Sequence, residues 1–446
     1  MMKPLRCLAV AVGIVALLDT PTAAAELSAG VARVDLTPPL AMGATLGGYG
    51  ERMSRPATGV HDRIWAKALV FSDGARKYVV ITADVLGFPP PLKPALVERL
   101  ADAGWTAEQL LLLPSHSHTS IEMNAIHPGN TFGLPPLGIY MPELYELTLD
   151  RLERVVREAA QALEPVTVGT GRLAIEGWNR NRRRTAQYAE RDLTLTRVAR
   201  LDGRPLAVLV NWTAHPTFMS GEDMEFSGGW PGHLQRTLEA LIGEGVSVMY
   251  YNGAEGDQSP IARIDSGESH WERAERYGRE LAIVCNGLYV EVTSERDVTF
   301  EYALQSFATP PRGWHPDFMQ TGGAEYGLSE KLLAELLPRL MPGESTIPVL
   351  RLGDLVIVGV PGEMAASLGR EIKMYTAGVT GARFPVIGGL ANEWISYILP
   401  EDEYEAGGYE ASVSFYGASL GPTVVAAAKQ AVSELTTEAQ RAQRKE

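Results

Sequence analysis

The sequence predicts an α/β protein in which mixed sheets are layered with flanking helices within a single large domain. Short apolar runs alternate with amphipathic segments through most of the 446 residues, as strands and helices do in layered α/β folds. The run 298–307 instead alternates apolar and polar residues like a half-buried antiparallel strand, so we expect mixed sheets. With 45% hydrophobic residues and no repeat or low-complexity linker, one large core is expected, with any subdivision near residue 300.

The individual elements follow from apolar periodicity and length. Continuous apolar runs predict buried strands at 77–84, 110–113, 204–211, 246–252 and 355–360. In segment 142–163, Leu144, Leu152 and Val156 keep helical spacing, which predicts an amphipathic helix. Similar patterns predict helices at about 94–103, 231–243, 269–290, 329–341 and 362–376, and a charged helical tail from about residue 425.

The first 25 residues have the composition of a cleavable secretory signal peptide. Lys3 and Arg6 precede an apolar run at 7–18, and the alanines at 23–25 are typical of a cleavage site. The apolar run is too short to cross a bilayer, although an uncleaved anchor is the alternative. This segment predicts a secreted or periplasmic protein.

The chain that would remain after cleavage is strongly acidic. Its formal charge would be −15 instead of −14, because the removed segment holds Lys3, Arg6 and Asp19. Such a charge repels nucleic acid, and the dense cationic patch at 180–184 is too short to argue otherwise. Cys285 would be its sole cysteine, so no internal disulfide is expected. We expect Cys285 to be a small core residue.

The run 110–113 leads into Pro114-Ser115-His116-Ser117-His118, which places two imidazoles where a buried strand leaves the core. If the backbone stays extended there, residues i and i+2 point to the same face, so both histidines can serve one site. Imidazole is the commonest protein metal ligand and a general acid or base near neutral pH. For this motif considered alone, a surface pair in a turn is the alternative.

Further apolar runs also lead to residues that can bind metal or transfer protons: Asp84, His215, Asp257, Glu363 and Tyr397. Because open α/β sheets bind ligands at the carboxyl ends of their strands, we expect one shared hydrolytic metal site instead of an unlinked surface set. Two or three imidazoles with one carboxylate suit Zn²⁺ with an open position for water. Bound zinc brings the pKa of water to about 7 and polarises a carbonyl, so hydrolysis of an amide or ester is the natural reaction.

Several short segments occur together in an order that matches a known family. They lie at 29–39, 59–62, 66–70, 116–118, 179–182, 211–215, 256–260, 361–363, 389–392, 396–397, 403–404, 409–410 and 415–417. In this order the sequence resembles the amino-terminal catalytic domain of the neutral/alkaline (non-lysosomal) ceramidases. The resemblance assigns residues 26–446 to one zinc hydrolase domain of that kind, without the carboxyl-terminal immunoglobulin-like domain of the family's long enzymes.

The resemblance implies a secreted, zinc-dependent amidase in which zinc-activated water attacks the acyl carbonyl of an N-acyl amide. The family's zinc ligands correspond to His116, His215, Glu363 and Tyr397. The partner it implies is a small-molecule or lipid N-acyl amide, reached in solution or at a membrane surface. No nucleic-acid partner is expected.

The resemblance also implies roles for residues around the metal. His118, Arg182 and Tyr409 correspond to positions that orient or polarise the scissile amide. Ser259 matches a serine that the family needs for activity, and we expect it to orient substrate or water. We expect the Asp257 carboxylate to hold a ligand histidine.

Each assignment has a structural alternative. Glu363 could be a first-turn acid of the predicted helix at 362–376, where the helix dipole favours it. Tyr397 and Tyr409 could be core aromatics with satisfied hydroxyls. Arg182 could belong to a solvated or acid-paired patch with its neighbours at 180, 183 and 184. The remaining histidines are expected to be ordinary surface or loop residues, with His233 the one that could line the pocket: His127, His233, His270 and His315.

The sequence also departs from the family. The family usually continues its His-x-His with Ser-Gly-Pro-Gly-Gly, whereas Thr119-Ser120-Ile121-Glu122-Met123 follows His118 here. We expect this rebuilt loop to lie beside the metal. Because of this difference, the resemblance does not identify the substrate. Two other interpretations remain: an amidohydrolase barrel that uses His215, His233 and Asp257, and a secreted binding protein without catalysis.

Overall fold

The computed structural model describes residues 26–261 and 267–443, and the predicted signal segment at 1–25 lies outside them. The larger sheet has eight strands in the order β11-β9-β8-β6-β1-β3-β4-β5. Their bounds are β1 Ser28–Asp35, β3 Trp65–Ser72, β4 Lys77–Ala83, β5 Leu110–Pro114, β6 Glu164–Ala174, β8 Asp192–Arg200, β9 Pro205–Trp212 and β11 Ser247–Asn252. The smaller sheet has the order β13-β14-β15-β17, with bounds β13 Phe300–Ala308, β14 Glu344–Leu352, β15 Leu355–Gly359 and β17 Phe384–Gly388.

The sheets are mixed, as the sequence predicted. The pairs β4–β5, β9–β11 and β15–β17 are parallel, whereas β13 pairs antiparallel with β14, as its alternating pattern indicated. Both sheets are open in the described residues, so the amidohydrolase barrel alternative is wrong. Three two-stranded pairs complete the strands: β2 Gly59–Val60 with β10 Glu225–Phe226, β7 Asn179–Asn181 with β12 Gln258–Pro260, and β16 Glu363–Met364 with β18 Tyr397–Ile398.

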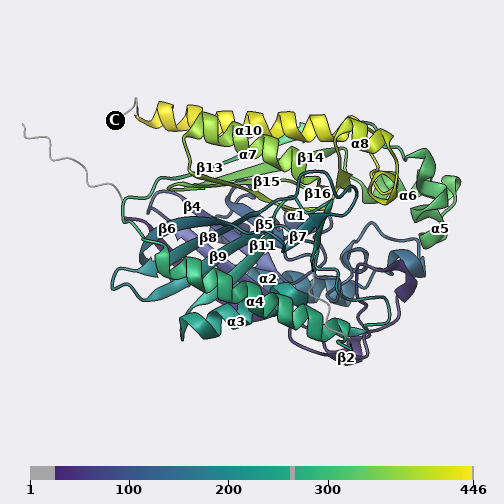
Figure 1. Ribbon diagram of the computed structural model, residues 1–446, viewed down its shortest axis with the longest axis horizontal. Coiled ribbons are helices and arrows are strands. Elements are labelled where there is room, and N and C mark those ends of the chain that lie inside the picture. The colour runs from purple at the N-terminus through teal and green to yellow at the C-terminus, as the bar shows by residue number, and fades with distance from the viewer. Residues whose placement is uncertain (1–25, 262–266, 444–446) are drawn as a thin grey trace, which may run out of the picture.

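The two sheets pack face to face, and helices cover their outer faces (Figure 1). Leu113 and Leu209 of the larger sheet share one buried cluster with Leu350 and Ile357 of the smaller sheet. Four helices cover the larger sheet: α1 Leu92–Leu100, α2 Pro142–Gln161, α3 Gly229–Ile242 and α4 His270–Glu291. The remaining helices pack on or beside the smaller sheet: α5 Gly322–Tyr326, α6 Glu330–Leu340, α7 Ala366–Thr380, α8 Glu401–Glu405, α9 Tyr409–Ser412 and α10 Leu420–Gln443.

One element differs from its prediction in a way that affects the site. The helix expected from 362 begins only at Ala366, because Glu363 and Met364 form strand β16. Glu363 N donates to Ser396 O at 3.1 Å, and Ala365 N donates to Ile398 O at 2.9 Å. The first-turn alternative for Glu363 is therefore wrong. The parallel register of β16 with β18 instead pairs Glu363 with Tyr397.

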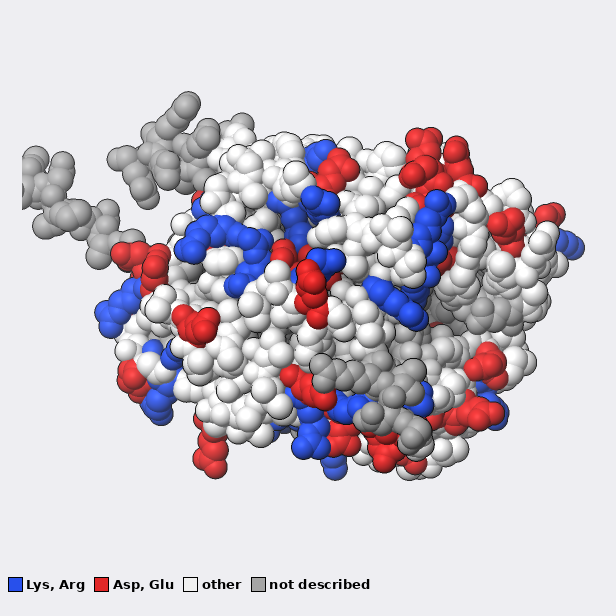
Figure 2. Space-filling view, in the orientation of Figure 1, with Lys and Arg blue, Asp and Glu red and all other residues white. Residues whose placement is uncertain are grey.

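The surface and the single described cysteine agree with the composition. Acidic and basic side chains are interspersed over the face in Figure 2. None of the described helices is both long enough and apolar enough to cross a membrane. Cys285 lies fully buried in the core between α4 and the larger sheet, as predicted.

Candidate metal centre

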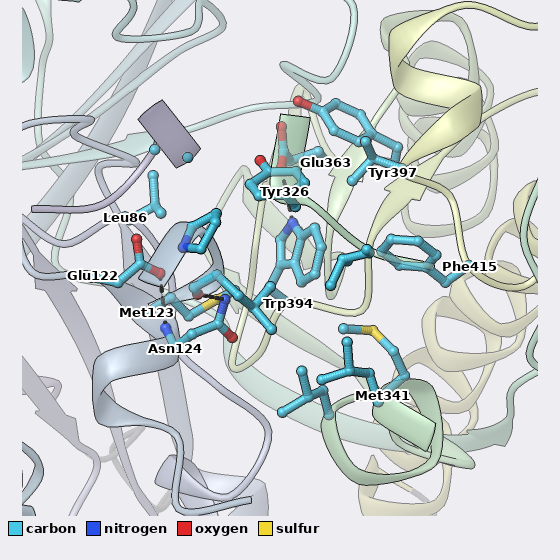
Figure 3. A pocket seen from close by; sticks show the side chains of 18 of the residues that line it. Leu86, Glu122, Met123, Asn124, Tyr326, Met341, Glu363, Trp394, Tyr397 and Phe415 are labelled. Carbon is cyan, nitrogen blue, oxygen red and sulfur yellow. Dashed lines mark hydrogen bonds between the residues drawn. The ribbon is translucent and has the colours of Figure 1, made fainter. Parts of the chain in front are cut away.

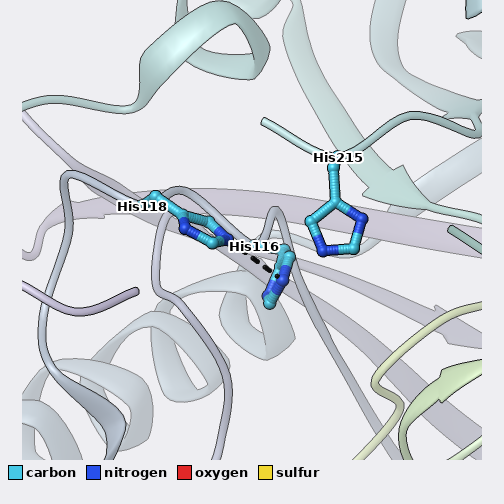
Figure 4. A group of neighbouring side chains, drawn as sticks. All are labelled: His116, His118 and His215. Carbon is cyan, nitrogen blue, oxygen red and sulfur yellow. Dashed lines mark hydrogen bonds between the residues drawn. The ribbon is translucent and has the colours of Figure 1, made fainter. Parts of the chain in front are cut away.

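Three histidines from two strand ends of the larger sheet lie close to one another (Figure 4). His116 and His118 follow β5, and His215 follows β9. His116 has a φ of 62°, so the backbone is left-handed there and the extended geometry assumed from the sequence is wrong. Both imidazoles nevertheless meet, with 3.3 Å between His116 Nε2 and His118 Nε2. The chain turns at His116 because β5 ends at Pro114.

Backbone carbonyls fix the orientation of two of these imidazoles. His116 Nδ1 lies 2.6 Å from Leu86 O, and His215 Nδ1 lies 2.8 Å from Glu255 O. A carbonyl only accepts, so each Nδ1 carries the proton and each Nε2 presents its lone pair. His118 has no such partner, because its buried Nδ1 forms no hydrogen bond. The ligand nitrogens of all three lie within 4.8 Å of one another.

Glu363 completes the group with a buried carboxylate. Its Oε2 lies 3.0 Å from His215 Nε2 and 3.6 Å from His116 Nε2. Its Oε1 accepts a hydrogen bond of 2.8 Å from Trp394 Nε1. Sequence reasoning missed Trp394, although it lies in the same segment as Tyr397. An indole N–H only donates, so its identity alone gave no sign that it would hold a ligand carboxylate.

Burial and mutual charge set the protonation of these groups. Burial drives the pKa of His118 well below its usual range and lowers the pKa of His215 to about 4. Burial acts to raise the pKa of Glu363, but His116 and His215 hold it well below its usual range. Neutral imidazoles beside an ionised carboxylate are the forms that bind a divalent cation. The donor set therefore fits zinc.

Tyr397 and Arg182 meet beside Glu363. Arg182 Nη2 donates to Tyr397 Oη at 3.0 Å and to Gly256 O at 2.8 Å, and Arg182 Nε donates to Glu410 Oε1 at 2.8 Å. Burial and the Glu363 charge raise the pKa of Tyr397 well above its usual range, and Arg182 opposes them. Arg182 is thus the arginine of the cationic patch that reaches the site.

Neighbouring arginines take other roles. Arg183 is buried against Glu403 and Glu410, at 3.1 and 2.7 Å, which confirms an acid-paired patch. Tyr409 lines the cavity described below, and its ring centroid lies 6.0 Å from that of Tyr397. Its side chain remains exposed, so a core role for Tyr409 does not hold.

Three residues singled out from the sequence lie apart from the histidine group. Asp257 accepts from Asn181, Gln258 and the backbone N–H of Ala366, so Glu255 O, and not Asp257, holds the ligand histidine. Ser259 lies in β12 opposite Arg180 and is not among the residues that line the described cavity. Asp84 accepts from Trp65 N and from Gln235, which gives it a structural role.

A cavity of about 140 Å³ opens beside the histidine group. His116, His118, Glu363 and Tyr397 lie at one end, and much of the remaining lining is apolar. The apolar lining comes mainly from α6 and the segments around it: Phe318, Leu328, Leu333, Leu336, Leu337, Leu340, Met341, Val413 and Phe415. Figure 3 shows Glu122 and Asn124 across the cavity from Phe415 and Met341.

Comparison with known proteins identifies the family. The family described as neutral/alkaline non-lysosomal ceramidase, N-terminal, matches residues 27–247 and 337–424. This chain belongs to that family. The neutral ceramidase of Pseudomonas aeruginosa is 20% identical over 452 residues, covering 82% of this chain and 66% of that protein. Neutral ceramidase 3 of Arabidopsis thaliana is 35% identical over 86 residues, which are 18% of this chain and only 11% of the relative.

Solved structures of the family share the fold. The crystal structure of the Pseudomonas aeruginosa enzyme superposes with a TM-score of 0.75 at 18% identity, covering 93% of this chain and 75% of that one. The rebuilt loop after His118 lines the same cavity as His116 and His118. Thr119, Ser120 and Ile121 are buried, and Glu122, Met123 and Asn124 line the cavity.

A second group, His61, Asp62 and His233, also has metal-like spacing. Arg236 Nη2 lies 3.0 Å from His233 Nδ1, and Arg236 Nη1 lies 2.8 Å from Asp62 Oδ1. Because the guanidinium only donates, His233 Nδ1 must accept and its Nε2 carries the proton. A cation would face that N–H and the guanidinium charge, so this group does not fit a metal.

The remaining histidines are less exposed than predicted. His127 and His315 lie in loops, as predicted, but are buried, whereas His233 is buried in helix α3, so the surface or loop assignment is wrong for His233. His127 Nδ1 accepts from Gly129 N and His315 Nδ1 accepts from Asp317 N, so each stabilises a local turn. An imidazole can be buried when its polar atoms have hydrogen-bond partners, and these partners cannot be identified from the sequence alone.

Proposed function

We propose that this chain is a secreted or periplasmic, zinc-dependent hydrolase of N-acyl amide bonds. The observation that carries the proposal is the convergence of His116 Nε2, His215 Nε2 and Glu363 Oε2 at one end of an apolar cavity. Membership of the neutral/alkaline ceramidase family supports amide hydrolysis. The apolar lining supports a substrate with a hydrocarbon chain, such as a lipid N-acyl amide.

His116, His215, Glu363 and Tyr397 would hold the ion. When bound, zinc supplies an activated water nucleophile and Lewis acidity at an acyl carbonyl. His118 lies against His116, with 3.3 Å between their Nε2 atoms, so its imidazole can take part in proton transfer beside the reacting carbonyl. Arg182 fixes the Tyr397 hydroxyl, and Tyr409 at the cavity wall can orient the amide.

Metal analysis and an amide panel test the proposal together. Purified protein should contain about one zinc per chain and hydrolyse N-acyl amides, and a chelator should abolish hydrolysis. Glu363→Ala should lose both metal and activity. Glu143→Ala is the matched control, because Glu143 is an exposed carboxylate in the first turn of α2. A metal-free protein that hydrolyses neither acyl amides nor simple esters would overturn the proposal.

A further inference from the structure

One wall of the cavity carries a carboxylate among largely apolar neighbours. Glu122 belongs to the rebuilt loop after His118, Asn124 follows that loop directly, and both line the cavity. They face Phe415 and Met341 on the opposite wall, and Glu363 and Tyr397 lie at one end (Figure 3). A substrate beside the histidines would therefore contact an apolar wall on one side and an acidic wall on the other.

Only half of the Glu122 carboxylate is used by the protein. Its Oε1 accepts from Asn124 N at 3.0 Å and caps the short helix Met123–Ile126. Among the described residues, none is seen to form a hydrogen bond with its Oε2. An ionised oxygen in such surroundings is costly, and burial raises the pKa of Glu122 to about 7.

The positive charge of Arg52 opposes the rise in the pKa of Glu122, but Arg52 forms no hydrogen bond with this carboxylate. Arg52 is buried, its Nη1 and Nη2 donate to the backbone carbonyls of Gly47, His118, Ser220 and Asp223, and its Nε forms no hydrogen bond. Arg52 thus holds the loop in place and leaves Glu122 with an unfilled acceptor. Asn124 adds a second acceptor. Its Nδ2 donates to Leu137 O at 2.8 Å, and its Oδ1 remains available to accept a hydrogen bond.

We propose that Glu122, assisted by Asn124, binds a hydrogen-bond-donating group of the substrate, either a hydroxyl or an ammonium. This group belongs to the part of the substrate that does not contact the apolar wall. The inference rests on the proposed hydrolase function. It makes Glu122 a specificity-determining residue, since a site built to pair with a donor rejects the analogue that lacks one.

A purely structural role for Glu122 makes a different prediction. Capping the helix Met123–Ile126 needs one oxygen, and glutamine supplies that oxygen in the same place. Glu122→Gln should therefore keep the thermal unfolding midpoint. It would turn an N–H₂ donor toward the substrate donor, and so remove the pairing.

The test uses N-acyl amides with one common acyl chain and three amine portions: one with a free hydroxyl, one with its O-methyl ether and one with an ammonium. kcat/KM and equilibrium binding are measured for the unmodified chain, Glu122→Gln and the exposed control Glu143→Gln. The unmodified chain and the control should prefer the donor-bearing compounds. Glu122→Gln should lower kcat/KM for them by about tenfold or more and leave the ether unchanged, because hydrogen bonds to charged groups contribute about 1.5–3 kcal/mol. A larger loss for the ammonium than for the hydroxyl identifies a cationic substrate.

The outcomes separate the two proposals. An equal loss for all three compounds, or no loss, overturns the role of Glu122 while hydrolysis itself still supports the enzyme. Absence of hydrolysis overturns the proposed function, and the binding measurements still test whether Glu122 selects the donor group. Asn124→Ala is the second variant, and it should reduce the same preference to a smaller extent.

Discussion

Removing the indole donor of Trp394 should weaken zinc binding at the candidate centre. Trp394 Nε1 donates to Glu363 Oε1 at 2.8 Å, and this bond orients the carboxylate whose other oxygen faces His215 and His116. Trp394→Phe keeps an aromatic ring in the cavity wall but removes the donor. Glu363 would then be free to rotate away from the histidines, so part of the ligand geometry would have to be restored on binding.

The magnitude follows from the type of bond. A hydrogen bond to an ionised group contributes about 1.5–3 kcal/mol, which corresponds to roughly 10–150-fold in a binding constant. Trp394 is only partly buried, so the lower end of this range is expected, and loss of partners that orient metal ligands typically costs about 10–100-fold. We therefore expect zinc affinity to fall by about tenfold.

Competition with a chelator of known affinity measures this change. Trp271→Phe is the control, because Trp271 stacks on His61 of the second histidine group, with 4.4 Å between ring centroids. Zinc affinity should be unchanged in the control. Equal affinities of Trp394→Phe and the unmodified chain, or an equal loss in both variants, would refute the reasoning.

Two further predictions concern packing and pH. Gly48→Ala should reduce kcat by tenfold or more and leave the zinc content unchanged. A Cβ at position 48 would lie 2.3 Å from His118 Nδ1, and the backbone φ of 93° there favours glycine. An unchanged kcat would contradict a role for His118. Lys93→Met should stabilise the fold at pH 7 by about 2–4 kcal/mol, since Lys93 Nζ is buried without a hydrogen bond and burial lowers the pKa of Lys93 to about 7. A depressed lysine pKa means that the unfolded chain binds more protons between pH 7 and 10.5, so the stability of the unmodified chain rises with pH in that interval. Denaturant unfolding should show the advantage of the variant shrinking by about 2–3 kcal/mol from pH 7 to pH 9, and a constant difference would show that Lys93 is not desolvated.

Much of the fold could be predicted because buried strands are locally encoded. Runs such as 77–84 and 110–113 are apolar throughout, since both faces of those strands are covered, and they became β4 and β5. The start of the helix at 362 was wrong because the pairing of Glu363 with Tyr397, 34 residues later, overrides the local pattern. Strand β1 was not predicted as such, since its sequence Ser28–Asp35 is neither apolar throughout nor regularly alternating in burial.

The part of the candidate site that could be predicted consists of side chains whose residue type itself suggests metal binding or proton transfer. The apolar runs pointed to a broader set of polar residues that also held Asp84 and Asp257, and the family resemblance selected His116, His215, Glu363 and Tyr397 from it. Trp394 and Glu122 could not be selected, because the same residue types also serve packing and capping. Asp257 was given the wrong contact, since a backbone carbonyl does that work and every residue has one.

The sequence by itself indicated the layered α/β class, the family and a set of candidate metal-binding residues. Only the tertiary structure decided how those residues are used. Leu86 O and Glu255 O fix the protons of His116 and His215 on Nδ1, so that both Nε2 lone pairs turn toward Glu363. Lone-pair direction depends on partners that the fold brings from distant parts of the chain. For the same reason, the sequence could not show that Glu122 lies across one cavity from Phe415 and Met341.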